Sequence, residues 1–274
     1  MLTNVLWPRS FDRWFNPEDV PLPKDCICQG AGYYRLHAPW GHPLYGKGIP
    51  CICHVNAEEK RKATELRRWS GVSVVQLFDL TFDRFLPELS VPPPNIDVKK
   101  VKTEMGRIKK VCEQYAARPE GWLVLTGSVG SGKTHLACAV VNAVLARGKG
   151  AHFNSVAGML DLLRGTYKIG AFDEWFRRLQ EVTVLALDDL GAERVTDWAN
   201  EKLFELIDHR YVNRLPLVVT TNLALTDERI QLRLRSRLQE GSHIRQGWSR
   251  VLPLPAGDIR PAREWIPHGT NWEL

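Results

Sequence analysis

Residues 127–134 read Gly-Ser-Val-Gly-Ser-Gly-Lys-Thr, and this stretch constrains the fold more than any other part of the chain. An apolar run of strand length, residues 122–126, precedes it, and apolar residues at helical spacing follow it as far as Val144. A glycine loop between a strand and a helix can cradle phosphate groups, because backbone N–H groups and the helix N-terminus face the anion. A flexible turn that holds Lys-Thr by chance would lack these flanks, so the pattern predicts an ATP-binding loop.

The positions of this loop differ in their predicted roles. Lys133 is expected to reach the β- and γ-phosphates, and the Thr134 hydroxyl is expected to ligate Mg²⁺. The other nucleotide contacts are expected from the rest of the loop, namely Gly127, Ser128, Val129, Gly130, Ser131 and Gly132.

Short apolar runs alternate with amphipathic stretches from this loop onward. Strands are predicted at 122–126, 151–154, 183–187 and 217–221, and helices at 134–147, 156–163, 172–179 and 198–211. Such alternation is typical of an α/β fold with a parallel sheet covered by helices on both faces. The prolines of residues 91–95 separate this part from an N-terminal region rich in Gly, Pro, His and Cys, which ends in a helix predicted over residues 57–69.

Two of the predicted strands end in side chains that suit ATP hydrolysis. Asp188 and Asp189 follow a buried strand, where one acid can hold the Mg²⁺ shell and the other can orient the attacking water. We assign the first role to Asp188 and the second to Asp189. Asn222 ends the next strand and could bond the γ-phosphate or the lytic water, although Asn at a strand end is also ordinary turn chemistry.

Three arginines, Arg233, Arg235 and Arg237, follow within five positions. An arginine that reaches into a neighbouring subunit's active site stabilises charge on the transferring phosphoryl group. The alternative is a basic helix face for nucleic acid or solvent, and the two readings are compatible.

These motifs, in this order, resemble the AAA+ ATPases of the DnaC/DnaI helicase-loader and IstB transposition-helper clade. The segments that carry the resemblance are GSVGSGKTHLA, LALDDLGAE, VVTTNL and RLRSRL, together with the lead-in at residues 80–85, and they cover roughly residues 77–250. The resemblance implies a P-loop AAA+ fold and an ATPase that oligomerises on DNA. It implies that Lys133 and Thr134 are Walker A residues, that Asp188 and Asp189 are the Walker B pair, that Asn222 is sensor 1, and that Arg237 is the arginine finger, with Arg233 beside it at the nucleotide.

Two departures from the wider AAA+ pattern carry expectations. Asp189 stands where most AAA+ proteins have Glu, so hydrolysis is expected to be slow and stimulated by DNA or a partner. No sensor 2 helix is evident after Arg250, so residues 251–274, which contain four prolines, are expected to form an irregular tail and the helical lid to be absent.

Four of the six cysteines form two tight pairs, Cys26 with Cys28 and Cys51 with Cys53. In a cytoplasmic protein such pairs favour metal over disulfide, and four thiolates would make a closed Zn²⁺ site. His42 could replace one thiolate, and four reduced surface thiols are the alternative without a metal. Residues 1–76 are therefore predicted to be a partner-binding module with a Zn²⁺ site.

Zinc-bearing N-terminal modules also occur in DnaI-like loaders, where they contact the helicase. This resemblance favours loading of the replicative DNA helicase onto single-stranded DNA by an ATP-dependent homo-oligomer. The alternative is an IstB-type helper of a transposase on duplex DNA. A helical-spacing cluster of Phe11, Trp14 and Phe15 could dock a partner but is more simply explained by packing on its own module.

Bulk properties agree with a DNA partner without requiring one. The net charge is +6 and the pI is near 9.0, which favours polyanionic partners. No apolar run reaches membrane-spanning length and no signal sequence is evident, so we expect a cytoplasmic protein without a membrane partner. A metabolic P-loop kinase would not need Asn222 or the arginine cluster, and intact Lys133, Asp188 and Asp189 argue against a vestigial ATPase.

Overall fold

A computed structural model describes residues 3–5, 24–29, 31–38, 40–90, 92, 97–192, 196–243 and 250–258. The chain divides into two compact units, Met1–Glu65 and Leu66–Leu274. The cluster of Phe11, Trp14 and Phe15, most of the proline segment at 91–95, and the tail from residue 259 lie outside the described residues. Within the described residues, no helix is long and apolar enough to cross a membrane.

The N-terminal unit contains a three-stranded sheet in the order β1-β2-β3, formed by Thr3–Val5, Tyr33–Leu36 and Ile49–Pro50. Helix α1, Ile52–Trp69, begins directly after Cys51, earlier than the expected start near residue 57. The sheet alternates along β2, so that Tyr34 and Leu36 are buried while their neighbours in sequence are exposed. The small core behind them is completed by Cys28, Ala38, Leu44, Ile49 and Cys51.

The second unit is built on a five-stranded parallel sheet in the order β5-β6-β7-β4-β8. The strands are β4 (Trp122–Gly127), β5 (Ala151–Ser155), β6 (Val184–Asp188), β7 (Leu217–Thr221) and β8 (Arg250–Leu254). Because all five are parallel, their carboxyl ends meet at one edge of the sheet, which is where such folds bind ligands. The first four strands are predicted from the sequence, and the structure confirms them to within one residue at each end.

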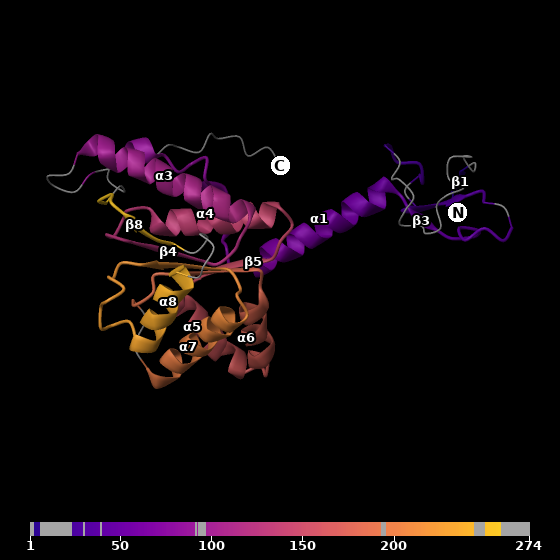
Figure 1. Ribbon diagram of the computed structural model, residues 1–274. Coiled ribbons are helices and arrows are strands. Elements are labelled where there is room, and N and C mark those ends of the chain that lie inside the picture. The colour runs from indigo at the N-terminus through magenta and orange to yellow at the C-terminus, as the bar shows by residue number, and fades with distance from the viewer. Residues whose placement is uncertain are drawn as a thin grey trace. The chain divides into compact units, whose positions relative to one another are not determined.

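Helices cover both faces of this sheet, as Figure 1 shows, with α3 and α4 on one face and α5 to α8 on the other. Their bounds are α2 (Val74–Asp79), α3 (Val98–Ala117), α4 (Lys133–Ala146), α5 (Val156–Tyr167), α6 (Phe172–Glu181), α7 (Asp197–Val212) and α8 (Leu232–His243), with a short 3₁₀ helix at Pro87–Leu89. Alternate residues of the buried strands supply the two cores, since Leu123 and Leu125 face α3 and α4 while Trp122 and Val124 face the other helices. The predicted α/β fold is therefore confirmed.

The tail expected to be irregular from residue 251 begins with a strand instead. Arg250–Leu254 pairs in parallel with β4, and Pro253 lies within it. Proline cannot donate a hydrogen bond to a second neighbour, but β8 is an edge strand with β4 on one side only, so the missing N–H costs little. The prediction of an absent lid concerns residues beyond 258 and stays a prediction.

The division between the units also differs in place from the boundary expected after residue 76. Leu66 and Val72 pack on the core of the second unit, and Phe153 N donates to Ser70 O at 2.7 Å along the outer edge of β5. This contact covers a sheet edge that would otherwise present unpaired backbone groups. Residues 66–76 therefore belong structurally with the sheet.

Arg210, in the last turns of α7, connects the end of α6 with the starts of β6 and β7 through hydrogen bonds. It is fully buried, and its guanidinium donates to backbone carbonyls at the end of α6 and at the starts of β6 and β7. Burial lowers its pKa to about 10, so it remains charged at neutral pH. In this way Arg210 satisfies carbonyl groups at the end of α6 that have no partner within the helix.

Candidate nucleotide site

The glycine loop between β4 and α4 has the backbone geometry that its sequence predicts. Gly127, Gly130 and Gly132 have φ values of 146°, 78° and 97°, and Gly132 is the N-cap of α4. These are conformations that side chains other than glycine rarely adopt. A Cβ at Gly127 would also lie only 2.8 Å from the carbonyl oxygen of Leu254. The loop therefore depends on glycine for its conformation at all three positions, and at Gly127 for space as well.

Lys133 is held inside this loop. Its side chain is buried, and Nζ donates to the carbonyl oxygens of Gly127 at 2.9 Å and Ser128 at 2.7 Å. Burial lowers the pKa of Lys133, and the neighbouring carboxylates of Asp188 and Asp189 offset part of this shift. The ammonium group therefore lies within the loop and close enough to both acids for their charges to act on it.

Asp188 and Thr134 face each other across the ends of β6 and the loop. Thr134 Oγ1 donates to Asp188 Oδ2 at 3.1 Å, and Thr220 Oγ1 donates to Asp188 Oδ1 at 2.6 Å. Burial raises the pKa of Asp188, whereas these two hydrogen bonds lower it. A hydroxyl and a carboxylate in direct contact are the oxygen ligands that Mg²⁺ prefers, so the pair could hold this ion with the phosphates.

Asp189 and Asn222 are also in direct contact. Asn222 Nδ2 donates to Asp189 Oδ1 at 2.7 Å, which joins the ends of β6 and β7. Asp189 has a φ of 59°, a left-handed conformation that Asp tolerates better than most residues. This turn directs its carboxylate away from the strand while Thr220 Oγ1 accepts its backbone N–H at 2.9 Å. The arrangement can orient a water molecule next to bound phosphate.

Thr220 is the residue of this group that the sequence argument missed. It is 1% exposed, and its hydroxyl contacts both Asp188 and the backbone of Asp189. The available signal was a threonine next to the end of an otherwise apolar strand in Val-Val-Thr-Thr-Asn. A buried hydroxyl requires a hydrogen-bond partner, and the acids on the adjacent strand were candidates for it.

The expected tail also contributes to the loop's surroundings. Ser128 Oγ donates to the carbonyl oxygen of Ala256 at 2.9 Å, and the Asp258 side chain lies directly over the Cα of Gly130. Residues 254–258 therefore pass along the phosphate loop. Their position follows from the pairing of β8 with β4. The prolines of this stretch did not predict such a strand.

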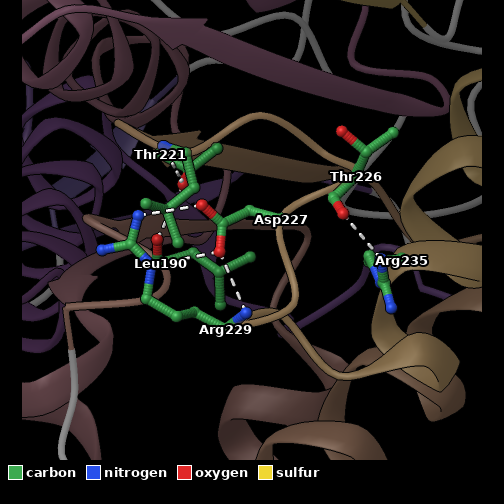
Figure 2. A network of polar contacts seen from close by, with 7 residues as sticks. Leu190, Thr221, Thr226, Asp227, Arg229 and Arg235 are labelled. Atoms are coloured by element: carbon green, nitrogen blue, oxygen red, sulfur yellow. Dashed lines mark hydrogen bonds and ion pairs between the residues drawn. The ribbon is translucent and has the colours of Figure 1, made fainter.

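The connection between β7 and α8 is held by its own polar contacts (Figure 2). Arg229 binds Asp227 through both its side chain and its backbone N–H, and these hydrogen bonds lower the pKa of Asp227 to about 2. Arg235 donates to the carbonyl oxygen of Thr226 at 2.8 Å. Arg235, the middle arginine of the cluster, thus has a structural role in fixing this connection.

The other two arginines of the cluster lie against α7. Arg237 Nε donates to Asp208 Oδ1 at 2.8 Å, and its guanidinium lies 4.3 Å from the ring centre of Tyr211. Arg233 lies 5.7 Å from the ring of Phe204. Helix α7 leaves the carboxyl end of β6 and returns to the start of β7, so its last turns lie at the opposite end of the sheet from Asp188. Arg237, which contacts these last turns, therefore lies away from the group formed by Lys133, Thr134, Asp188, Asp189 and Asn222. Arg233 contacts the middle of α7, and its place beside the nucleotide stays a prediction.

Candidate zinc site in the N-terminal unit

The structure brings together the four cysteines that the sequence pairs suggested. The sulfur atoms of Cys26, Cys28, Cys51 and Cys53 all lie within 4.8 Å of one another, and Cys28 Sγ is 3.2 Å from Cys53 Sγ. Tetrahedral zinc with Zn–S bonds of about 2.3 Å separates sulfur atoms by about 3.8 Å. The donor set therefore fits Zn²⁺. His42 is not a member of this cluster, and its Nδ1 accepts the N–H of Leu44.

Chelation is expected to unfold the N-terminal unit and leave the second unit folded. Two of the seven buried residues of the small core, Cys28 and Cys51, belong to the cluster, so metal binding would supply much of the unit's stability. We expect Cys51→Ser to abolish bound zinc, measured by atomic absorption, and to expose residues 24–65 to limited proteolysis.

Cys112 offers a matched control because it is buried in the core of the second unit, away from the cluster. Cys112→Ala should leave the zinc content unchanged. Purified wild-type protein without zinc, with all four thiols free to alkylate, would contradict a metal site.

Comparison with known proteins

Residues 104–232 match the family of IstB-like ATP binding proteins. A putative ATP-binding protein in an insertion sequence of Mycobacterium tuberculosis is 39% identical over 105 residues, covering 37% of this chain and 41% of that protein. The replicative helicase loader DnaC of Escherichia coli is 27% identical over 143 residues, covering 48% of this chain and 58% of the loader. The chain thus matches only about half the length of these relatives.

Among solved structures, the crystal structure of the DnaC helicase loader superposes with a TM-score of 0.51 at 23% identity, over 65% of this chain and 97% of that one. At this identity the superposition establishes the fold. The fold and the phosphate loop define an α/β P-loop protein with an ATP-binding domain. Within its second unit, residues 104–232 match the IstB-like ATP binding proteins, and the same region is similar to DnaC.

Proposed function

We propose that the protein is a cytoplasmic AAA+ ATPase that loads the replicative DNA helicase onto single-stranded DNA as a nucleotide-switched homo-oligomer. The observation that carries the proposal is that Arg237 lies apart from the other groups expected to take part in hydrolysis. Lys133, Thr134, Asp188, Asp189 and Asn222 converge at one edge of the sheet, while Arg237 of α8 contacts the last turns of α7. An arginine that cannot reach its own nucleotide can act in a neighbour's site, which makes assembly a condition of hydrolysis.

In this mechanism each group of the site has one task. The loop N–H groups and Lys133 bind the phosphates. Thr134 and Asp188 would hold Mg²⁺, which when bound would neutralise charge on the phosphoryl group. Asp189 orients the attacking water, and Asn222 fixes the Asp189 carboxylate through its amide. The aspartate side chain is one methylene shorter than that of glutamate, so slow hydrolysis stimulated by DNA or a partner is the expected behaviour.

An aromatic and cationic cluster at α5, α6 and α7 supports the choice of single-stranded DNA. Tyr167, 50% exposed, stacks on Phe172 at 4.1 Å between ring centres, and Arg164 lies 4.9 Å from the ring centre of Trp198. Bases stack on exposed rings, and cations attract the phosphate backbone. The members of this cluster come from three separate helices, so their proximity is not visible in the sequence.

The second candidate is an IstB-type helper of a transposase that binds duplex DNA. It is favoured by the family match of residues 104–232 and by the relative from an insertion sequence. The ATPase mechanism is the same in both candidates, and they differ in partner and in the form of DNA.

A loading assay separates the two. The full chain is mixed with the replicative helicase of its host on circular single-stranded DNA coated with single-strand-binding protein, and unwinding of an annealed strand is followed with ATP. We expect unwinding to require both the chain and ATP. ATP-dependent filaments on duplex DNA that capture the transposase, without any helicase loading, would overturn the loader proposal in favour of the helper.

A further inference from the structure

One face of the N-terminal sheet presents aromatic and cationic side chains in a row. Tyr33, Arg35 and His37 alternate with buried residues along β2 and its end, and all three are exposed. Alternate residues of a strand lie about 7 Å apart on the same face. Tyr33 is fixed in place, because its hydroxyl lies 2.8 Å from His54 Nε2 and its ring packs on the His54 ring. The orientation of the first side chain in this row, Tyr33, is therefore fixed by His54.

The connection from β2 to β3 adds two more exposed rings. Trp40 is 86% exposed and Tyr45 is 52% exposed, and they meet edge to face with ring centres 5.2 Å apart. Leu44 of the same connection is fully buried in the small core, which anchors the loop that carries them. An indole this exposed contributes almost nothing to its own core, so folding does not account for it.

The charge of this region matches a polyanion. Between residues 24 and 51 the sequence has three cations, Lys24, Arg35 and Lys47, and a single acid, Asp25. Among the described residues of this stretch, the exposed large hydrophobic side chains are all aromatic, namely Tyr33, Trp40 and Tyr45. Exposed rings next to cations, with a single acid in the stretch, suit stacked bases and a phosphate backbone.

We infer that the surface formed by Tyr33, Arg35, His37, Trp40, Tyr45 and Lys47 binds single-stranded nucleic acid, independently of ATP. Bases stack on the rings, and Arg35 and Lys47 contact the phosphate backbone. This site goes beyond the proposed ATPase function, because it lies in the other unit and uses none of the nucleotide-binding residues. It gives the chain a sequence-independent hold on an unpaired strand before ATP is bound.

The test uses the full zinc-loaded chain without nucleotide and a short oligothymidylate that carries 5-iodouracil. Ultraviolet crosslinking followed by peptide mass spectrometry should place crosslinks within residues 33–47. In fluorescence anisotropy, the double variant Arg35→Gln with Trp40→Ala should bind about tenfold or more weakly, since each stacked base contributes about 1–3 kcal/mol. Lys62→Gln, an exposed cation on α1, is the control and should bind like wild type. An oligouridylate arm distinguishes RNA from DNA as the natural strand.

The possible outcomes are separable from those of the loading assay. A Lys133→Met chain should retain the crosslinks within 33–47 even though it cannot use ATP, so failure of the loader proposal leaves this result standing. Crosslinks confined to the second unit would overturn the inference. So would unchanged affinity in a double variant that keeps its zinc, or a double variant that loses a protein partner and still binds the oligonucleotide. The wild-type crosslinks decide the matter even where the double variant fails to fold.

Discussion

Lys133→Met is expected to lower ATP hydrolysis by about two to three orders of magnitude or more, the usual effect of removing one preorganised donor from a developing anion. The ammonium group is the positive charge that the structure places within the glycine loop, next to Asp188 and Asp189. Methionine keeps the length and apolar stem of the side chain but supplies no charge. Nucleotide affinity should fall as well, measured by titration with a fluorescent ATP analogue, and hydrolysis by phosphate release.

A structural side effect has to be separated from this chemical one. Lys133 also donates to the carbonyl oxygens of Gly127 and Ser128, so its loss removes two hydrogen bonds from the loop. Thermal unfolding of the variant should therefore be compared with that of Lys149→Met, which changes an exposed lysine just after α4. A Lys133→Met protein that hydrolyses ATP at the wild-type rate would refute the assignment of the phosphate site.

The sequence was sufficient for the parts of the site that depend on chain order alone. In a parallel sheet the polar residues that follow successive strands must meet at one edge, so Thr134, Asp188 and Asn222 could be brought together without coordinates. The hydrophobic period fixed the strands and helices between them. The direct contact between Asp189 and Asn222 adds a detail that follows from the adjacency of β6 and β7.

Features that depend on which strands are neighbours could not be found in this way. Strand β8 carries Pro253, and only its place at the sheet edge makes that residue acceptable. Once β8 is paired with β4, Ala256 and Asp258 come to lie beside the phosphate loop, although the local sequence contains no sign of this. The same limit applies to Thr220, whose partner is on another strand.

The cysteine pairs show an intermediate case. Their residue type and spacing predicted a metal site, but a Cys-x-Cys pair leaves the choice among thiolates and His42 open. In the structure Cys53 lies in the first turn of α1 while Cys26 and Cys28 lie before β2, and the four sulfur atoms lie together in a group that does not include His42. The exposed row on β2 was missed because the sequence argument assigned its neighbours only to a turn-rich module.

Arg237→Ala is expected to lower hydrolysis in the assembled protein by about three orders of magnitude or more while leaving each subunit folded and able to bind ATP. The pairing with Asp208 is part-exposed at both side chains, and such a pair contributes only about 0–1 kcal/mol, so stability should change little. Analytical ultracentrifugation with a non-hydrolysable ATP analogue and single-stranded DNA should show whether the variant still assembles. Arg177→Ala, an exposed arginine on α6, serves as the matched control and should behave as wild type.

Mixing two inactive variants distinguishes action in a neighbour from action within the same chain. A Lys133→Met subunit retains Arg237, and an Arg237→Ala subunit retains Lys133, so a mixed oligomer contains interfaces at which an intact loop faces an intact arginine. Activity should therefore reappear on mixing if Arg237 works across the interface, and it should rise and then fall as the ratio of the two variants is varied. No recovery at any ratio, in mixtures shown to co-assemble, would mean that Arg237 acts only through Asp208 and Tyr211 in its own chain. In that case assembly would have to control ATP hydrolysis through another residue.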